Sequence, residues 1–349
     1  MKHLVSFPLL LLSMTVLLSC RGTQKPDESK KPSEDSEMEY PKTGFLERFH
    51  SSLDLIIAPG QQPEILAEGF EWSEGPLWLP NQQMVIFSDI PNNSIYQWSE
   101  KDGLKLYLKP SGYTGTVSRG GETGSNGLLL DQEGHLVLCQ HGDRRIAWMN
   151  APLDQPEANF STIVDNWEGK RFNSPNDAVF ANNGDLFITD PAYGMELRYK
   201  DPKREMDFTG VFRYDTNGEI TLLTDQMSAP NGIGLSADES VLYVANSGSE
   251  NFIWMAYDFS EDGSLTNARV FHDASVASDT LKGAPDGLVV RSDGIIFATG
   301  PGGVWIFNPA GQHLGTIRTG EATSNCTLDS ENQYLYMTAD MYLMRIRLE

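Results

Sequence analysis

The sequence predicts an all-β fold, a six-bladed β-propeller with a central metal site, and three observations lead to it. A short triplet recurs six times along the 349 residues, and each copy follows a Ser or a Pro. Successive copies begin 52, 50, 55, 55 and 39 residues apart. Between them, short apolar runs alternate with turns rich in Asp, Asn and Gly. Strand-built repeats of about 40–50 residues are typical of propellers rather than of layered folds.

Each triplet begins with a side chain that carries oxygen. The six copies read Glu74-Gly75-Pro76, Asn126-Gly127-Leu128, Asn176-Asp177-Ala178, Asn231-Gly232-Ile233, Asp286-Gly287-Leu288 and Asn325-Cys326-Thr327. One such triplet alone reads as a turn. Six in register, each opening the innermost strand of a blade, would direct six oxygen-bearing side chains towards one axis. Carboxylates and carboxamides in a ring are the ligands that a hard cation prefers.

The blades follow from the strand-like runs between the triplets. We expect blade one to start at Glu74 and blade six to end near Leu348. Residues 63–69 also have a strand pattern, and we expect them to add the outer strand of the last blade. Closure of this kind hides sheet edges that otherwise invite aggregation. Two long linkers, residues 110–124 and 190–210, are candidates for functional loops near the triplets.

The N-terminal residues have the pattern of a bacterial lipoprotein signal. Lys2 precedes an apolar run, and Leu17-Leu18-Ser19-Cys20 resembles a lipoprotein cleavage box with Cys20 as the acylated residue. We therefore expect a signal peptide over residues 1–19, a flexible tether over 20–43 and the propeller over 44–349. The expected location is the cell envelope, on the periplasmic or cell-surface side, with the lipid anchor as the only membrane contact. We expect a monomer.

The net charge limits the class of binding partner, and the positions of the cysteines bear on disulfide formation. The formal net charge is −22, from 48 acidic and 26 basic residues, which argues against a nucleic-acid partner. Besides Cys20 the chain has Cys139 and Cys326 in strand-like settings of different repeats. The sequence leaves open whether these two pair, and their setting favours two buried thiols.

Several ordered motifs resemble the family of senescence marker protein (regucalcin), gluconolactonase and luciferin-regenerating enzyme, and are most similar to its bacterial gluconolactonase-like branch. The motifs are Ser73-Glu74-Gly75-Pro76, Asn126-Gly127-Leu128, His141-Gly142-Asp143-Arg144-Arg145, Asn173-Ser174-Pro175-Asn176-Asp177, Thr189-Asp190-Pro191-Ala192-Tyr193-Gly194, Pro230-Asn231-Gly232-Ile233 and Pro285-Asp286-Gly287-Leu288. The resemblance implies a six-bladed propeller with one divalent cation, usually Ca²⁺, in its central tunnel. Mg²⁺, Mn²⁺ and Zn²⁺ are the alternatives.

The resemblance also implies roles for individual residues. It assigns the cation ligands to Glu74, Asn176, Asn231 and Asp286, with substrate contact as the alternative for Asn176 and an acid/base role added for Asp286. Asn126 would line the tunnel and contact substrate. From the sequence itself, His141 is a second catalytic candidate because imidazole titrates near neutral pH, and a structural histidine is the alternative. Asp190 and Tyr193 precede a long loop and are expected at the rim, in contact with substrate.

The expected function is the opening of a sugar lactone by attack of water on an ester carbonyl that the cation polarises. One departure from the family pattern concerns specificity, because Ser174 stands where the animal branch carries an Arg that contacts the sugar. Two other functions stay open. One is a phosphotriesterase-like hydrolase, and the other is a non-catalytic, calcium-stabilised, sugar-binding lipoprotein.

Overall fold

The computed structural model describes residues 39–278 and 280–349, and its compact unit spans Tyr40–Glu349. The expected signal peptide, the expected acylation site Cys20 and most of the expected tether lie outside the described residues. The compact unit begins before residue 44, where the sequence placed the boundary, because Tyr40 Oη donates to Glu100 Oε2 and Lys42 pairs with Glu64. No helix in the described part of the chain is long and apolar enough to cross a membrane.

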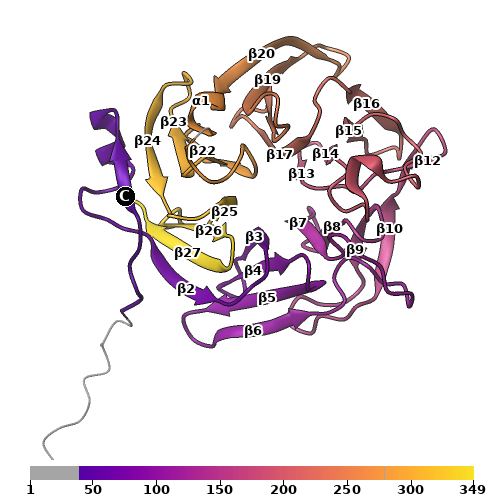
Figure 1. The fold of residues 1–349 in the computed structure, drawn as a ribbon, viewed down its shortest axis with the longest axis horizontal. Helices are drawn as coiled ribbons and strands as arrows, with labels where there is room; N and C mark the ends of the chain where they lie inside the picture. Colours follow the sequence, from indigo (N-terminus) through magenta and orange to yellow (C-terminus); the bar gives the residue numbers. More distant parts are fainter. Residues whose placement is uncertain (1–38, 279) are drawn as a thin grey trace, which may run out of the picture. The chain divides into compact units, whose positions relative to one another are not determined.

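The unit Tyr40–Glu349 is a ring of six antiparallel sheets, as the sequence predicted (Figure 1). Blades one and two contain β3 (Ser73–Leu79), β4 (Met84–Asp89), β5 (Ser94–Ser99), β6 (Gly103–Leu108), β7 (Ser125–Leu130), β8 (Leu136–Gln140), β9 (Arg145–Met149) and β10 (Phe160–Val164). Blades three and four contain β13 (Ala178–Phe180), β14 (Leu186–Asp190), β15 (Gly210–Tyr214), β16 (Ile220–Thr224), β17 (Pro230–Leu235), β18 (Val241–Asn246), β19 (Ile253–Phe259) and β20 (Leu265–Asp273). The first strand of each blade lies nearest the centre.

Two N-terminal strands complete the last two blades. Blade five contains β21 (Leu288–Val290), β22 (Ile296–Gly300), β23 (Gly303–Phe307), β24 (His313–Arg318) and then β1 (Phe45–Arg48). Blade six contains β25 (Thr323–Leu328), β26 (Tyr334–Ala339), β27 (Tyr342–Arg347) and then β2 (Glu64–Glu68). The pairing of β2 with β27 confirms the expected closure of the ring by residues 63–69. Each inner strand also contacts the inner strands of both neighbouring blades.

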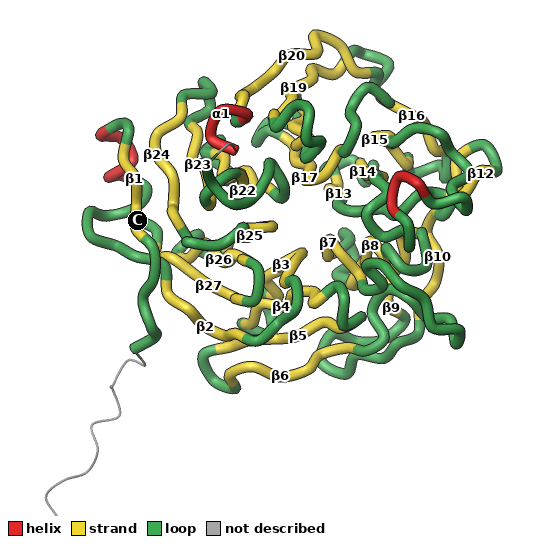
Figure 2. Tube along the Cα trace, in the orientation of Figure 1, coloured by secondary structure: helices red, strands yellow, loops and turns green. Residues whose placement is uncertain are grey.

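The remaining elements are short and lie between blade strands. They are η1 (Ser51–Leu55), the hairpin of β11 (Asn166–Trp167) and β12 (Lys170–Arg171), η2 (Arg198–Lys200) and α1 (Ser275–Ser278). Figure 2 shows that loops make up most of the chain between blades two and three. The two long loops expected from the sequence are present, one between β6 and β7 and the other between β14 and β15.

The hydrophobic core is divided into six clusters, one at each interface between blades. Between blades one and two, for example, Ile86 and Ile95 pack with Leu136 and Leu138, all four fully buried. The corresponding clusters join blades two and three, three and four, four and five, five and six, and six and one. Burial of apolar surface therefore fixes the angle between successive sheets, and this holds the inner strands around one axis.

Candidate functional site

The six triplets lie at the starts of the inner strands, as the sequence predicted. Four of them coincide with a shift in strand register, as at Glu74/Leu77 in β3 and Pro230/Ile233 in β17. A bulge leaves residues unpaired with the neighbouring strand and turns a side chain out of the regular alternation. In these four blades the regular alternation of the inner strand is therefore interrupted at or next to the leading residue of the triplet.

Hydrogen bonds join the triplet regions into a closed ring. At every blade interface, a group from one blade donates to a backbone carbonyl at the triplet of its neighbour. The bonds are Ser88 Oγ to Asn126 O (3.0 Å), Gly127 N to Asn176 O (2.8 Å), Thr189 Oγ1 to Asn231 O (2.7 Å), Ser247 Oγ to Pro285 O (2.5 Å), Gly287 N to Ser324 O (2.7 Å) and Ser324 Oγ to Ser73 O (2.7 Å). The ring holds the six leading side chains at fixed mutual positions.

A cavity of about 470 Å³ opens at the triplet end of the propeller. Six of the residues expected in the site line it, namely Glu74, Asn126, Asn176, Tyr193, Asn231 and Asp286. Glu122, Arg198 and Ser247 line it as well, although the sequence had not assigned them to the site. This size lies in the range of small-molecule sites, roughly 300–1,000 Å³.

The two carboxylates of the expected ligand set repel one another in this cavity. Burial raises the pKa of Glu74 to about 8, against hydrogen bonds from Gly75 N and from Asn325. Burial and then the charge of Glu74 raise the pKa of Asp286 well above its ordinary value. Asp286 Oδ1 is buried without a hydrogen-bond partner. A divalent cation would remove both penalties, so these residues fit a hard cation.

The amides complete an all-oxygen donor set. Asn231 Nδ2 donates to Ser247 Oγ at 2.9 Å, which leaves the amide oxygen of Asn231 available to a ligand. The Asn176 side chain lines the cavity, and its backbone is fixed by bonds to Thr189 and Gly127. The described residues contain no group of three or more His, Cys, Asp and Glu side chains placed to hold a metal. The set that does come together has two carboxylates and two amides, which suits Ca²⁺ better than Zn²⁺.

Asp190 does not lie at the rim, where the sequence had led us to expect it. It is fully buried, and its carboxylate accepts from Asn173 N and Ser174 N, both at 2.7 Å. Burial raises the pKa of Asp190 to about 7, although the two N–H groups oppose the shift. Asp190 therefore holds the segment that carries Asn176 and has no surface to offer a substrate.

His141 lies behind the cavity wall instead of facing the substrate. It is fully buried, and burial, then the charge of Arg119, lowers the pKa of its imidazole to about 3. Nε2 lies 3.4 Å from Asn126 Nδ2, which is a donor, so the ring proton belongs on Nδ1. Nδ1 has no hydrogen-bond partner and lies 3.6 Å from Glu122 Oε2. His141 is therefore neutral and lies next to Asn126 and Glu122, two residues that line the cavity.

Glu122 is a carboxylate at the cavity that the sequence did not predict. It lies in the loop between β6 and β7, lines the cavity, and pairs through Oε1 with Arg198 Nη2 at 3.2 Å. Burial raises the pKa of Glu122 to about 7, against the positive charge of Arg198. The only signal in the sequence was its place in a glycine-rich loop of unusual length, and that signal does not single out one residue.

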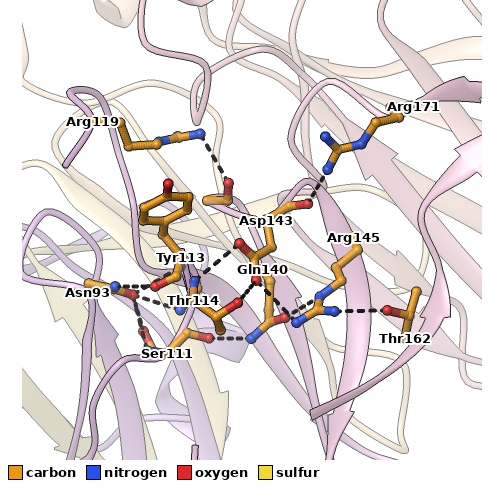
Figure 3. A network of polar contacts seen from close by, with 12 residues as sticks. Asn93, Ser111, Tyr113, Thr114, Arg119, Gln140, Asp143, Arg145, Thr162 and Arg171 are labelled. Carbon is orange, nitrogen blue, oxygen red and sulfur yellow. Dashed lines mark hydrogen bonds and ion pairs between the residues drawn. The ribbon is translucent and has the colours of Figure 1, made fainter. Parts of the chain in front are cut away.

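A polar network holds this loop against blade two (Figure 3). Arg119 Nη1 donates to Gly142 O at 3.0 Å, and Thr114 Oγ1 donates to Asp143 Oδ2 at 2.5 Å. Gln140 Nε2 donates to Ser111 O at 2.8 Å and so joins the start of the loop to β8. These hydrogen bonds fix the position of the loop between β6 and β7, which carries Glu122.

Asp177 occupies the middle position of its triplet, where four others have Gly. Its carboxylate accepts from Ala178 N at 2.9 Å and from Ile233 N of the next blade at 3.4 Å. Burial raises the pKa of Asp177 to about 7. The bond to Ile233 N joins blades three and four. Asp177 also lines a separate cavity at the inner strands, formed by residues that follow the triplets.

The two thiols of the propeller take no part in the site. Cys139 and Cys326 are both buried and free, in agreement with the preferred interpretation of the sequence. Burial raises the pKa of both thiols, so neither is a reactive thiolate.

The arrangement resembles proteins of known activity. The model of the SMP-30/Gluconolactonase/LRE-like region matches residues 72–340. A gluconolactonase of Zymomonas mobilis is 36% identical over 312 residues, which cover 87% of this chain and 86% of the relative. A pentonolactonase of Haloferax volcanii is 25% identical over 271 residues, which cover 76% of this chain and 80% of the relative.

Solved structures agree with these similarities. A gluconolactonase from Xanthomonas campestris superposes with a TM-score of 0.75 at 27% identity, covering 90% of this chain and 99% of the other. A calcium-binding regucalcin from Agrobacterium tumefaciens superposes with a TM-score of 0.61 at 17% identity, covering 81% of this chain and 93% of the other. The second likeness supports the fold alone.

Proposed function

Because this chain belongs to the SMP-30/gluconolactonase/LRE-like family, we propose that it is a divalent-metal-dependent hydrolase that opens a sugar lactone. The class, a lactone-hydrolysing carboxylic-ester hydrolase, follows from relatives that are gluconolactonase, pentonolactonase and lactonohydrolase. The observation that carries the proposal is the cavity in which Glu74 and Asp286 meet the amides of Asn176 and Asn231.

These four side chains would hold the cation, with Ca²⁺ as the preferred ion. When bound, the cation would supply positive charge that polarises the ester carbonyl and stabilises the charge developing on its oxygen. Asn126, Asn176 and Tyr193 support substrate binding because they line the same cavity. Tyr193 supplies an aromatic ring for the sugar, and the amides supply donors and acceptors for its hydroxyls.

Hydrolysis needs two proton transfers, one from the attacking water and one to the departing ring oxygen. Water forms the new C–O bond and gives up a proton, the ring C–O bond breaks, and the ring oxygen takes a proton as an alcohol. Asp286 is the candidate acid/base by family resemblance, but ligation of a cation would keep it ionised. Glu122 is the second candidate, because it lines the cavity without belonging to the ligand set and burial raises its pKa to about 7.

The proposal is tested by a pH-stat assay over a panel of sugar lactones, with Ca²⁺, Mg²⁺, Mn²⁺ and Zn²⁺ added in turn to chelated protein. Cation-dependent hydrolysis of a lactone supports it. Faster hydrolysis of organophosphates would favour a phosphotriesterase-like enzyme. Loss of thermal stability on chelation, without hydrolysis of any ester, would favour a sugar-binding protein.

The location in the cell is a separate proposal, which the Leu17-Leu18-Ser19-Cys20 box supports. Acylation of Cys20 would anchor the propeller to the envelope on the periplasmic or cell-surface side. Metabolic labelling with a radioactive fatty acid should mark the wild type and leave Cys20→Ala unlabelled. Equal labelling of both chains would contradict the anchor.

A further inference from the structure

A second cavity of about 490 Å³ lies beside the one that holds the acidic residues. Tyr193, Arg198 and Ser247 line both cavities, so these three side chains form the boundary between them. The second cavity is completed by residues of three segments, namely Tyr199, Ser228, Ala229, Gly248, Ser249 and Glu250.

The topology places both cavities at one end of the propeller. Tyr193, Arg198 and Tyr199 belong to the loop that follows β14, and the segment from Ser247 follows β18. Ser228 lies just before β17, whose triplet carries Asn231. Antiparallel strands of one blade bring the start of β17 and the end of β18 to the same edge. A ligand that extends from the acidic residues can therefore reach the second cavity without leaving this face.

The Tyr193 ring at the boundary is held by the neighbouring side chains of Tyr199 and Arg198. The rings of Tyr193 and Tyr199 meet edge to face, with centroids 5.8 Å apart and planes at 87°. The Arg198 guanidinium lies 5.9 Å from the centre of the Tyr193 ring and also pairs with Glu122. Arg198 has a backbone φ of 49°, in the left-handed region that residues other than Gly seldom adopt. Strain of this kind is often found where a side chain is held for a ligand.

The chemistry of the second cavity is that of a site for a neutral polyhydroxylated ligand. Tyr199 offers a partly exposed ring, and Ser228 and Ser249 are exposed hydroxyls. The positive charge of Arg198 is paired with Glu122, and Glu250 and the net charge of −22 disfavour an anionic ligand. A tyrosine ring has an apolar face and a polar hydroxyl, and a sugar likewise has apolar C–H faces and polar hydroxyls, so the two suit one another.

We propose that this second cavity is a sugar subsite, and that the preferred substrate is the lactone of a disaccharide with its lactone ring beside Asp286 and its other sugar against Tyr199. This inference rests on the proposed lactone hydrolysis and deepens it. Only the reducing-end ring is opened, so the second sugar contributes binding energy without reacting. Such remote binding energy appears in kcat/KM for the larger substrate alone.

The kinetic test compares glucono-1,5-lactone with cellobiono-1,5-lactone on the full chain with Ca²⁺. The subsite predicts a kcat/KM at least about tenfold higher for the disaccharide lactone in the wild type. Tyr199→Ala removes the ring and Ser249→Trp fills the cavity, so both should bring this ratio close to one with little change towards the smaller lactone. Trp148→Ala, which removes a similarly exposed ring on blade two, is the matched control and should keep the wild-type ratio.

A binding measurement keeps the two proposals distinguishable. Calorimetric titration should show tighter binding of cellobionate than of gluconate to the wild type, and no such preference in Tyr199→Ala. If no lactone is hydrolysed but this preference is present, the subsite stands and the proposed function fails. If the wild type hydrolyses and binds both ligands equally, or the two variants weaken both equally, the subsite is refuted.

Discussion

Asn231 Nδ2 donates a hydrogen bond of 2.9 Å to Ser247 Oγ, and the Ser247 hydroxyl donates in turn to Pro285 O at 2.5 Å. This chain of two bonds fixes which end of the Asn231 amide faces the cavity, because the nitrogen is already used. It also joins the leading residue of the fourth triplet to the residue before Asp286. One serine outside the triplets thus orients the Asn231 amide and ties it to the backbone next to Asp286.

Removing the Ser247 hydroxyl tests whether it orients the Asn231 amide. Ser247→Ala leaves the Asn231 amide free to rotate, and loss of a group that orients a metal ligand commonly costs about 10–100-fold in metal affinity. We expect a loss of this size in Ca²⁺ affinity by calorimetric titration, with an unchanged circular dichroism spectrum. Ser249→Ala, two residues away and outside this chain of bonds, is the control. Equal Ca²⁺ affinity in the two variants would refute the role of Ser247.

A second pair of variants distinguishes Glu122 from Asp286 as the acid/base group. Glu122→Gln keeps the shape of the side chain but removes the carboxylate, and we expect kcat to fall about 100-fold or more with Ca²⁺ affinity unchanged. Glu196→Gln changes a carboxylate of the loop between β14 and β15, outside the cavity, and should leave kcat unchanged. A kcat near wild type in Glu122→Gln would leave Asp286 as the acid/base group.

The pH–rate profile should distinguish Glu122 from His141. Burial raises the pKa of Glu122 to about 7, so a basic role predicts a rate that rises as the pH approaches 7 from below. Burial lowers the pKa of His141 to about 3, so the imidazole stays neutral over this range. We expect His141→Gln to lower kcat but keep the acid limb of the profile. Loss of that limb in His141→Gln would restore histidine as the titrating group.

The buried carboxyl group of Asp190 should make the free energy of unfolding depend on pH. Its pKa is about 7 in the folded chain and near its ordinary value of 3.8 in the unfolded chain, so the folded state binds more protons between these values. Stability should therefore fall as pH rises from about 4 to 7, by at most about 1.4 kcal/mol per pH unit from this group. Asp190→Asn should reduce that slope in urea unfolding of the chelated protein. An unchanged slope would contradict the buried position of this carboxylate.

The glycines of the triplets make a steric prediction. A Cβ on Gly232 would lie 2.1 Å from the backbone oxygen of Asp286, so Gly232→Ala must push two triplets apart. Overpacking of this kind typically costs about 1–3 kcal/mol of the free energy of unfolding, and it should lower Ca²⁺ affinity as well. Gly120→Ala meets its nearest atom at an ordinary 3.5 Å and serves as the control. Wild-type stability and affinity in Gly232→Ala would contradict the packed ring of triplets.

Much of the fold could be predicted because the inner strands repeat a strong local pattern. The triplets and the apolar second strands such as β4 are buried, and their sequence patterns indicate it. The closing strand β2 was recognisable from its strand-like pattern. The outer strands were harder to identify, because one of their faces meets solvent and they lack an apolar run. β20 is exposed over most of its length and has no such run. The strand β1 was missed for the same reason.

The site was less predictable, because burial decides the role of a polar residue and one sequence does not report it. Asp190 ends β14 and His141 follows β8, positions typical of rim residues, yet both side chains are fully buried. Glu122 and Ser247 do not belong to the repeated triplets, so no recurring sequence pattern singles them out. They enter the site because loops that are distant in the sequence meet over the triplets.

The most direct test of the account measures the Ca²⁺ dependence of glucono-1,5-lactone hydrolysis in a pH-stat, for chelated wild type, Glu74→Gln and Asp286→Asn. If Glu74 and Asp286 hold the catalytic cation, Ca²⁺ restores hydrolysis by the wild type, whereas both variants stay folded, lose most of their Ca²⁺ affinity and stay near the uncatalysed rate. Full hydrolysis by the chelated wild type, or Ca²⁺-dependent rates near wild type in either variant, would show that these two carboxylates do not hold the catalytic cation.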